Sequence, residues 1–200
     1  MKTLKKCSKS GLALAFFLLS FLQTQAQESP VLHRTPRVAI SSNLLYDATT
    51  SMNLGMEFRL SDRFTFKLPV TYNPWTFHDN KKFKHLLVQP EVRWWFCESF
   101  SGHYLGLHGH YAIFNVGGIG STRTMRDFRR EGDLWGAGLS YGYQFYLSPR
   151  WNLELSLGLG YARLDYDKYQ CETCGDYVGS EKKDYIGPTQ AGISLIYIIK

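Results

Sequence analysis

The sequence lacks, after its first 22 residues, any apolar run long enough to form a membrane-spanning helix. Such a helix needs about 20 predominantly apolar residues. The mean hydropathy of −0.25 also argues against a bundle of membrane helices. Because backbone in lipid must satisfy its hydrogen bonds internally, the alternative for a membrane protein is a closed β-barrel.

Cysteine, proline and uncompensated charge are also scarce. The chain has 4 Cys and 7 Pro, and its formal net charge is +6. Much of that charge is the leader's, in Lys2, Lys5, Lys6 and Lys9. The remaining chain is nearly balanced, so its charge predicts no nucleic-acid partner.

The N-terminus has the pattern of a secretory signal. A lysine-rich start precedes an apolar run from Gly11 to Leu22, too short to span a membrane, and then Ala26. We therefore expect a signal peptide over 1–26 with cleavage before Gln27, and a polar lead-in over 27–36. No Cys follows the apolar run, which argues against a lipoprotein.

Strict alternation of apolar and small or polar residues dominates what remains, and it is clearest from Trp151 to Tyr161. A period of two is typical of a β-strand, and eleven residues suffice for a tilted strand to cross a bilayer. The pattern predicts about eight strands in residues 37–200, near 38–46, 52–60, 64–72, 86–97, 104–116, 134–147, 151–161 and 189–200, with a bulge or kink at Pro90.

Short and long connections alternate along the predicted strands. The long ones cover about 73–82, 117–133 and 165–188. Outer-membrane barrels combine short periplasmic turns with long external loops. We therefore expect an all-β, antiparallel, up-and-down transmembrane barrel in the outer membrane of a Gram-negative bacterium, with both mature termini in the periplasm.

Alternation does not by itself say which face is outside, since a soluble lipocalin-like binder also alternates. Here the apolar face carries side chains too bulky for a small interior, among them Trp94 and Trp135, whereas the other face is rich in Gly and Ser. Aromatic residues also lie near both ends of the apolar strips, as interfacial girdles do. We therefore favour an apolar face toward lipid.

The inner face then carries charged and histidine side chains. They are expected to form a mixed-sign network that plugs the lumen, because unpaired buried charge is costly. A proton or ion path is the alternative. The predicted network comprises Glu57, Arg59, Lys67, Glu91, Arg93, His108, His110 and Glu154.

Cys171 and Cys174 form a CxxC pair in a predicted exposed loop of an exported chain. A local disulfide is the favoured interpretation. Zinc would need two further ligands, and none lies nearby at a recognisable spacing. No cofactor or metal site is predicted.

Two further groups suggest weaker possibilities. His108 and His110 raise the alternative of a lipid A-modifying barrel enzyme, but the lumen is the wrong place for outer-leaflet chemistry. Two predicted external loops are locally basic and suit lipopolysaccharide phosphates or an acidic glycan, although solvated loops are the simpler interpretation. Their basic residues are Lys81, Lys82, Arg123, Arg126, Arg129 and Arg130.

Three segments resemble a known family: NLLYDATTSMNLGME at 43–57, YNPWTF at 72–77 and DNKKFKHLLVQPEVRW at 79–94. They are similar to the domain-of-unknown-function 3575 family of outer-membrane β-barrel proteins from Bacteroides-like bacteria. The resemblance covers about 37–200. It implies the barrel fold and a frequent association with fimbrial gene clusters, and it implies no catalytic residues. Some members carry a peptidoglycan-binding domain, which we do not expect after Lys200.

Together these patterns predict a non-enzymatic outer-membrane barrel, structural or displaying loops for adhesion or fimbria-related assembly. Its expected partners are membrane lipid, lipopolysaccharide and fimbrial or other surface proteins.

Overall fold

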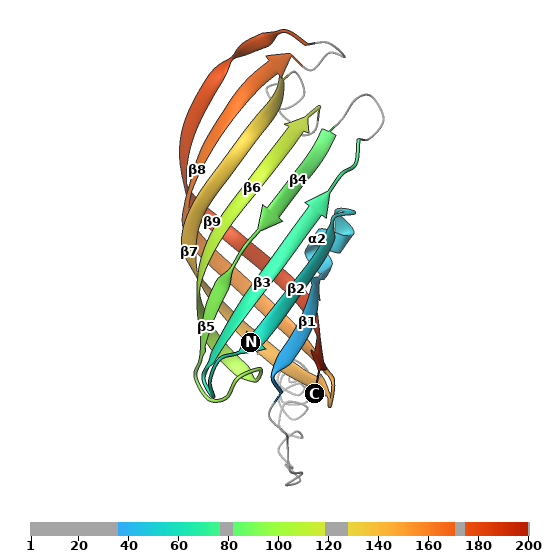
Figure 1. Ribbon diagram of the computed structural model, residues 1–200, viewed down its shortest axis with the longest axis vertical. Helices are drawn as coiled ribbons and strands as arrows, with labels where there is room; N and C mark the ends of the chain where they lie inside the picture. Colours follow the sequence, from blue (N-terminus) through green and yellow to red (C-terminus); the bar gives the residue numbers. More distant parts are fainter. Residues whose placement is uncertain (1–35, 77–81, 119–127, 171–174, 200) are drawn as a thin grey trace, which may run out of the picture. The chain divides into compact units, whose positions relative to one another are not determined.

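The computed structural model describes residues 36–76, 82–118, 128–170 and 175–199. The predicted signal peptide and nearly all of the lead-in lie outside these ranges. Nine strands and one short helix follow each other along the chain (Figure 1): β1 (Val38–Asn43), α2 (Leu44–Ala48), β2 (Met52–Arg59), β3 (Phe64–Asn73), β4 (Lys82–Val88), β5 (Glu91–Trp95), β6 (Gly102–Gly117), β7 (Phe128–Ser148), β8 (Trp151–Gln170) and β9 (Tyr177–Ile199).

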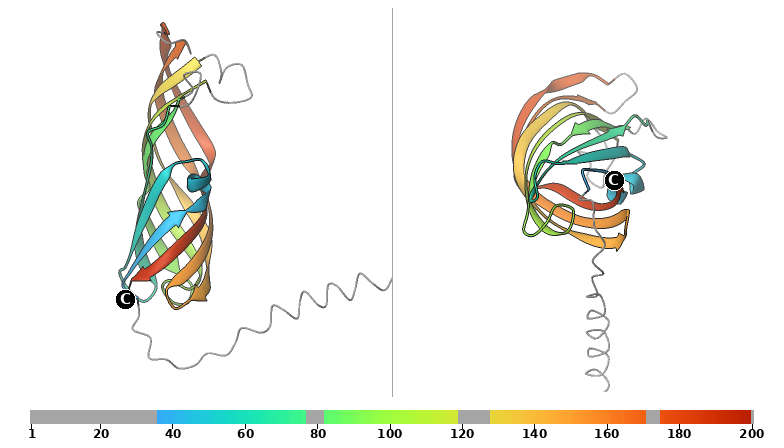
Figure 2. Two further views of the ribbon diagram at one scale, coloured as in Figure 1. Left: turned by 90° about the vertical axis from the view of Figure 1, so that its right-hand side faces the viewer. Right: turned by 60° about the horizontal axis from the view of Figure 1, so that its bottom comes forward.

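The strands form one antiparallel sheet that closes into a ring (Figure 2). Strands that follow each other in sequence pair, except that β4 and β5 each pair with β3 and β6. The ring closes because β1 also pairs with β9, from Val38 opposite Ile199 to Asn43 opposite Ser194. This arrangement is an up-and-down β-barrel, and it confirms the predicted all-β antiparallel fold. At one end the connections are short. The connections toward the other end, called the upper end here because of its place in Figure 1, are mostly longer; the first of them contains α2, which lies well below the tops of β7, β8 and β9.

The predicted fourth strand is divided at Gln89 and Pro90. Its halves, β4 and β5, both lie between β3 and β6. Pro90 has no N–H to donate, but its carbonyl accepts from Gly109 N at 3.0 Å. The ring therefore has eight positions, as predicted, although nine strands are labelled.

Side chains alternate between the two faces as predicted over Trp151–Tyr161. Leu155 and Leu157 lie on the outer surface with 42% and 57% of their area exposed, whereas Asn152 and Glu154 are buried inside. The same alternation in β6 and β7 exposes Leu107 and Leu139 outside the barrel. The outer face is thus a broad apolar surface.

The first strand ends earlier than the pattern predicts. Residues 44–46 belong to α2 instead, because Asn43 accepts from Leu45 N through its side chain and begins a helical turn. The Asn43 side chain also bonds two backbone groups of β9: it donates to Ala191 O at 3.1 Å and accepts from Ile193 N at 3.2 Å. Asn43 therefore continues the strand pairing where β1 stops.

The described parts of two predicted long loops are largely strand, so the loop assignment was wrong for those residues. β7 begins at Phe128, inside the predicted loop 117–133, and β8 and β9 extend into the predicted loop 165–188. The extensions mix polar with scattered apolar residues on both faces, so alternation gives little signal there, while backbone pairing continues. Ion pairs such as Lys182–Asp165, at 2.8 Å, support it.

No helix among the described residues is long and apolar enough to cross a membrane.

Candidate functional site in the barrel interior

The lower end of the barrel is closed by apolar and aromatic side chains. Trp95, Tyr104 and Ile196 are completely buried there, and Phe100 covers them from the turn after β5. The rings of Trp95 and Tyr104 lie 4.9 Å apart. This packed layer fills the lower end of the barrel interior with side chains.

Above this layer, Arg93 is the centre of a buried ionic network. Its guanidinium bonds Glu57 at 3.0 Å, Glu91 at 2.7 Å and Glu154 at 2.7 and 3.0 Å. Lys67 adds a second cation to Glu154 at 3.0 Å. The network therefore sets three carboxylates against two cations, and all five side chains are buried.

Neighbouring groups satisfy the remaining oxygens of these carboxylates. Thr65 donates to Glu57 at 2.6 Å and accepts from Trp95 Nε1 at 2.9 Å, and Ser140 donates to Glu91. The Arg93 guanidinium also lies 4.2 Å from the centre of the Tyr104 ring, within cation–π distance. A buried charge with this many partners is much less costly than an isolated one.

Strand register explains why distant residues meet here. Thr65 lies opposite Arg93, and Lys67 lies opposite both Glu57 and Glu91. Opposite Arg93 on its other side is Gly106, where a Cβ atom would collide with the Ser140 and Glu91 side chains. Glycine at this position therefore leaves room for the network.

Three of the predicted network residues lie elsewhere. Arg59 pairs with Asp62 at a lower turn, at 2.6 Å, and takes no part in the network. His108 bonds Thr189 Oγ1 at 2.9 Å, and the ring of His110 lies 5.8 Å from that of His108. The two histidines are higher in the lumen, and neither forms an ion pair with a described carboxylate.

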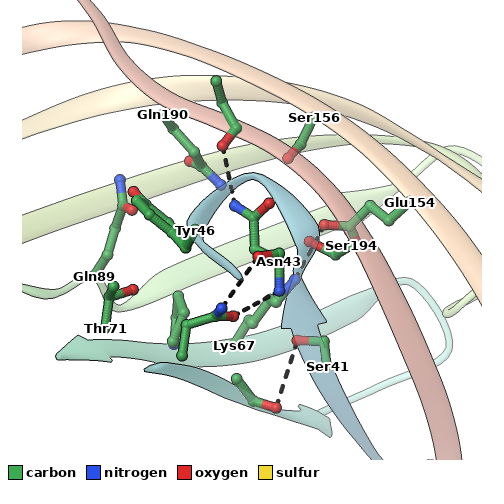
Figure 3. Close-up of a pocket in the computed structure, with 14 residues that line it drawn as sticks. Ser41, Asn43, Tyr46, Lys67, Thr71, Gln89, Glu154, Ser156, Gln190 and Ser194 are labelled. Carbon is green, nitrogen blue, oxygen red and sulfur yellow. Dashed lines mark hydrogen bonds and ion pairs between the residues drawn. The ribbon is translucent and has the colours of Figure 1, made fainter. Parts of the chain in front are cut away.

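A small polar cavity of about 30 Å³ borders the upper side of the network. Figure 3 shows Asn43 at its centre, with Lys67, Glu154, Gln190 and Ser194 around it. This volume holds about two water molecules, and polar atoms surround it. The lumen is therefore filled with polar groups at this height.

A much larger and mainly apolar cavity lies above the histidines, and we call it the upper chamber. Its volume is about 700 Å³, and residues of α2, β4, β6, β7, β8 and β9 line it. The chamber is lined by Leu45, Tyr46, Thr49, Phe83, His85, Leu87, His110, Ala112, Val116, Leu134, Ala162, Leu164, Lys183, Tyr185, Pro188, Thr189, Gln190 and Ala191.

The upper chamber is not among the features predicted from the sequence. The alternation predicts small or polar inner positions throughout, whereas at this height the inner face carries Leu134, Ala162 and Leu164. A signal existed, since Ala162 and Leu164 continue the even, inward positions of β8 beyond Tyr161. A change from polar to apolar residues along the inward positions of a strand indicates that the lumen becomes apolar at that height.

The predicted external basic group is only partly described. Lys81, Arg123 and Arg126 lie outside the described residues. Lys82 begins β4, and Arg129 and Arg130 belong to β7, where their guanidinium groups lie over the rings of Tyr169 and Tyr166 at 4.8 and 5.9 Å. These two arginines are thus packed on neighbouring strands.

The predicted Cys171–Cys174 disulfide also lies outside the described residues. Cys97, near the lower end, has an exposed free thiol. Among residues 36–76, 82–118, 128–170 and 175–199, no group of three His, Cys, Asp or Glu side chains is arranged to hold a metal ion.

Comparison with known proteins gives one match. A family model described as "Protein of unknown function (DUF3575)" matches residues 12–199. No curated protein and no solved structure matches the chain.

Proposed function

The chain belongs to the DUF3575 family of proteins of unknown function, and on that premise we propose that it is a non-enzymatic barrel of the bacterial outer membrane, with a sealed lumen and an upper wall displayed at the cell surface. The apolar outer face carries this proposal. Its exposed side chains include Leu107, Leu139, Leu157 and Leu159, each more than half exposed. A water-soluble protein rarely leaves so large a contiguous apolar surface uncovered.

Aromatic side chains near both ends of the apolar face support the same proposal. Trp94 and Trp151 lie outside near the lower end, and Tyr72 and Trp135 lie outside higher up. Such aromatic belts suit the two membrane–water interfaces, where amphipathic rings meet head groups.

The ionic network supports a lumen that does not conduct. An interior of eight strand positions is narrow enough for side chains to fill. Arg93 and its carboxylates occupy it from β2, β5 and β8, and Trp95 with Tyr104 closes it below. A pore for ions or solutes would require this network to move.

The lengths of the strands support a role at the cell surface. A strand needs about 9–11 residues to cross a bilayer, whereas β8 has 20 residues and β9 has 23. Their upper halves would stand above the membrane, next to lipopolysaccharide. We propose that this wall serves adhesion or fimbria-related assembly, with another surface protein as the partner.

Fractionation of cells that produce the full chain tests the location. We expect the protein in the outer-membrane fraction, and a shift in gel mobility between unheated and boiled samples, because a folded barrel resists detergent. Recovery of the folded protein in the soluble fraction would contradict the proposal. A planar-bilayer recording tests the seal: we expect no steady channels from wild type.

A further inference from the structure

We propose that the upper chamber binds a single-chain amphiphile with an acidic head group, of which a free fatty acid is the simplest example. This inference goes beyond the proposed function, because it concerns a ligand and does not depend on where the barrel resides. It rests on the volume, the lining and the charge of the chamber.

The volume and lining of the chamber suit an apolar chain. Small-molecule sites typically enclose about 300–1,000 Å³ and are mainly apolar with a few placed polar groups. The chamber, at about 700 Å³, falls within that range. Its apolar lining includes Phe83, Leu87, Val116, Leu134 and Leu164, from the adjacent strands β4, β6, β7 and β8. A chamber of this size has room for one acyl chain, and it is small for a lipid with two.

The charges around the chamber favour an acidic head group. Among the described residues that line it there is no Asp or Glu, whereas Lys183, His85 and His110 are present. Lys183 forms no ion pair with another described residue. Its neighbour Lys182, by contrast, pairs with Asp165, and Lys168 pairs with Glu181. A carboxylate at the chamber would give Lys183 a partner.

Unpartnered polar atoms lie at the floor of the chamber. His110 is only 7% exposed, and its Nδ1 has no hydrogen-bond partner in the described structure. The Oε1 atom of Gln190, which also lines the chamber, has none either. Buried polar groups are nearly always bonded in folded proteins, so such atoms beside a cavity indicate a place for a ligand or water.

The chamber also lies where strand pairing no longer closes the ring. β1 pairs with β9 only up to Asn43 and Ser194, and β9 above that level is paired on one side, with β8. The chamber is lined on one side of this break by α2, through Leu45, and on the other by β9, through Pro188. An apolar ligand would cover surfaces that no strand covers.

Photolabelling tests the inference directly. The mature barrel would be folded into nanodiscs of phosphatidylcholine and exposed to a diazirine-bearing fatty acid, with labelled residues located by mass spectrometry. We expect labels on chamber residues of β7 and β8, such as Leu134 and Leu164. Labels confined to the outer face, with none in the chamber, would overturn the inference.

Matched variants separate the chamber from the lipid-facing surface. Ala162→Trp places a large ring in the chamber, and Ala137→Trp makes the same change on the outer face of β7. We expect Ala162→Trp to reduce chamber labelling about fivefold and Ala137→Trp to leave it unchanged. Equal labelling in the two variants would contradict the inference. If Ala162→Trp does not fold, Ala112→Phe fills the same space from β6.

Two further comparisons test the nature of the ligand. Lys183→Ala should weaken labelling by the fatty acid about threefold, a small effect because an ion pair between exposed groups contributes little to affinity. Lys182→Ala should leave this labelling unchanged. A diazirine fatty alcohol should label wild type less than the acid does. If the alcohol labels the chamber as strongly as the acid does, the ligand does not need an acidic head group. If phosphatidylglycerol with a diazirine acyl chain labels it equally, the ligand does not need to have a single chain. If the barrel were soluble and still bound the fatty acid, the proposed membrane location would be wrong while the inference about the ligand would stand.

Discussion

The lower lumen and the upper chamber have the same strand geometry and opposite chemistry. In the lower lumen, the inward positions of β2, β5 and β8 are Glu57, Arg93 and Glu154, and their polar atoms bond one another. In the chamber, the inward positions are mainly apolar, as at Leu134 and Leu164, and a buried polar atom of His110 lacks a partner. The charged groups of the lower lumen thus pair with one another, whereas the chamber has a volume of about 700 Å³ in which a ligand could lie.

This difference predicts different responses to mutation. A fully bonded network depends on each member, because removing one leaves other charges buried and unpaired. A large cavity tolerates changes in side-chain size, because few atoms fill the space beside them. The following predictions measure that contrast, from the largest expected effect to the smallest.

Arg93→Met should produce the largest loss of stability. It leaves Glu57, Glu91 and Glu154 with only Lys67 as a cation, and breaking a buried ion pair costs about 3–5 kcal/mol. Urea unfolding of the barrel in lipid vesicles, followed by tryptophan fluorescence, measures the change. Arg59→Met is the control. Its partner Asp62 is 92% exposed, so the cost should stay within about 1 kcal/mol. Similar losses for both variants would show that the network does not stabilise the barrel.

Truncation of an apolar side chain should also distinguish the two regions. Ile196→Ala removes a completely buried side chain from the lower seal and should cost about 2–5 kcal/mol. Leu134→Ala removes a half-buried side chain that borders the chamber, and it should cost less than about 1 kcal/mol. The same urea titration applies. An equal cost at both positions would mean that the chamber is packed as tightly as the seal.

Enlarging a side chain should also destabilise the lower end more than the chamber, with smaller losses of stability than truncation causes. In Gly142→Ala the new Cβ collides with the Tyr104 ring, which Trp95 and Arg93 hold at 4.9 and 4.2 Å. Overpacking of this kind costs about 1–3 kcal/mol. Ala162→Trp adds a larger group toward the chamber and should cost less. The temperature at which half of the protein changes its gel mobility ranks the stability of the two variants. A lower temperature for Ala162→Trp than for Gly142→Ala would contradict the proposed difference between the two regions.

Much of this fold was predictable from the sequence, because lipid-facing and lumen-facing positions alternate with a period of two. That rule located Trp151–Tyr161 and identified Glu57, Arg93 and Glu154 as inward residues. It could not place Arg59, because a residue at a strand end has a local partner within reach, here Asp62. It also could not show which inward charges meet, since that depends on register between strands.

The extensions and the chamber were missed for a related reason. Beyond Tyr161 both faces of β8 are polar or mixed, so strand pairing there leaves little trace in the hydrophobic pattern. α2 was missed because it is one turn long and its start depends on the side chain of Asn43. The chamber is lined by residues of six separate elements, α2, β4, β6, β7, β8 and β9, so its volume follows only from their arrangement in space.

The extended β8–β9 hairpin should respond to pH, with the smallest effect of the four. The Tyr166 hydroxyl donates to Glu181 at 2.8 Å and, with Lys168, holds the pKa of Glu181 below its ordinary value. A carboxyl group with a lowered pKa stabilises the fold above its ordinary pKa, and that contribution is lost as the pH falls through the folded pKa. Because Glu181 is at the surface, the change should be local.

Amide hydrogen exchange locates this change along the chain. Protection of Tyr177–Lys183, corrected for intrinsic exchange rates, should fall as the pH drops below the ordinary pKa of a glutamate, about 4.3, while protection of the β6–β7 pairing around Leu139 stays constant. Glu181→Gln should lower protection of the hairpin at neutral pH and remove part of its dependence on acid. If Glu181→Gln exchanges like wild type at every pH, the Tyr166–Glu181 bond does not stabilise the hairpin. Loss of protection at Leu139 in step with the hairpin would instead show that the upper wall and the lower barrel unfold as one unit.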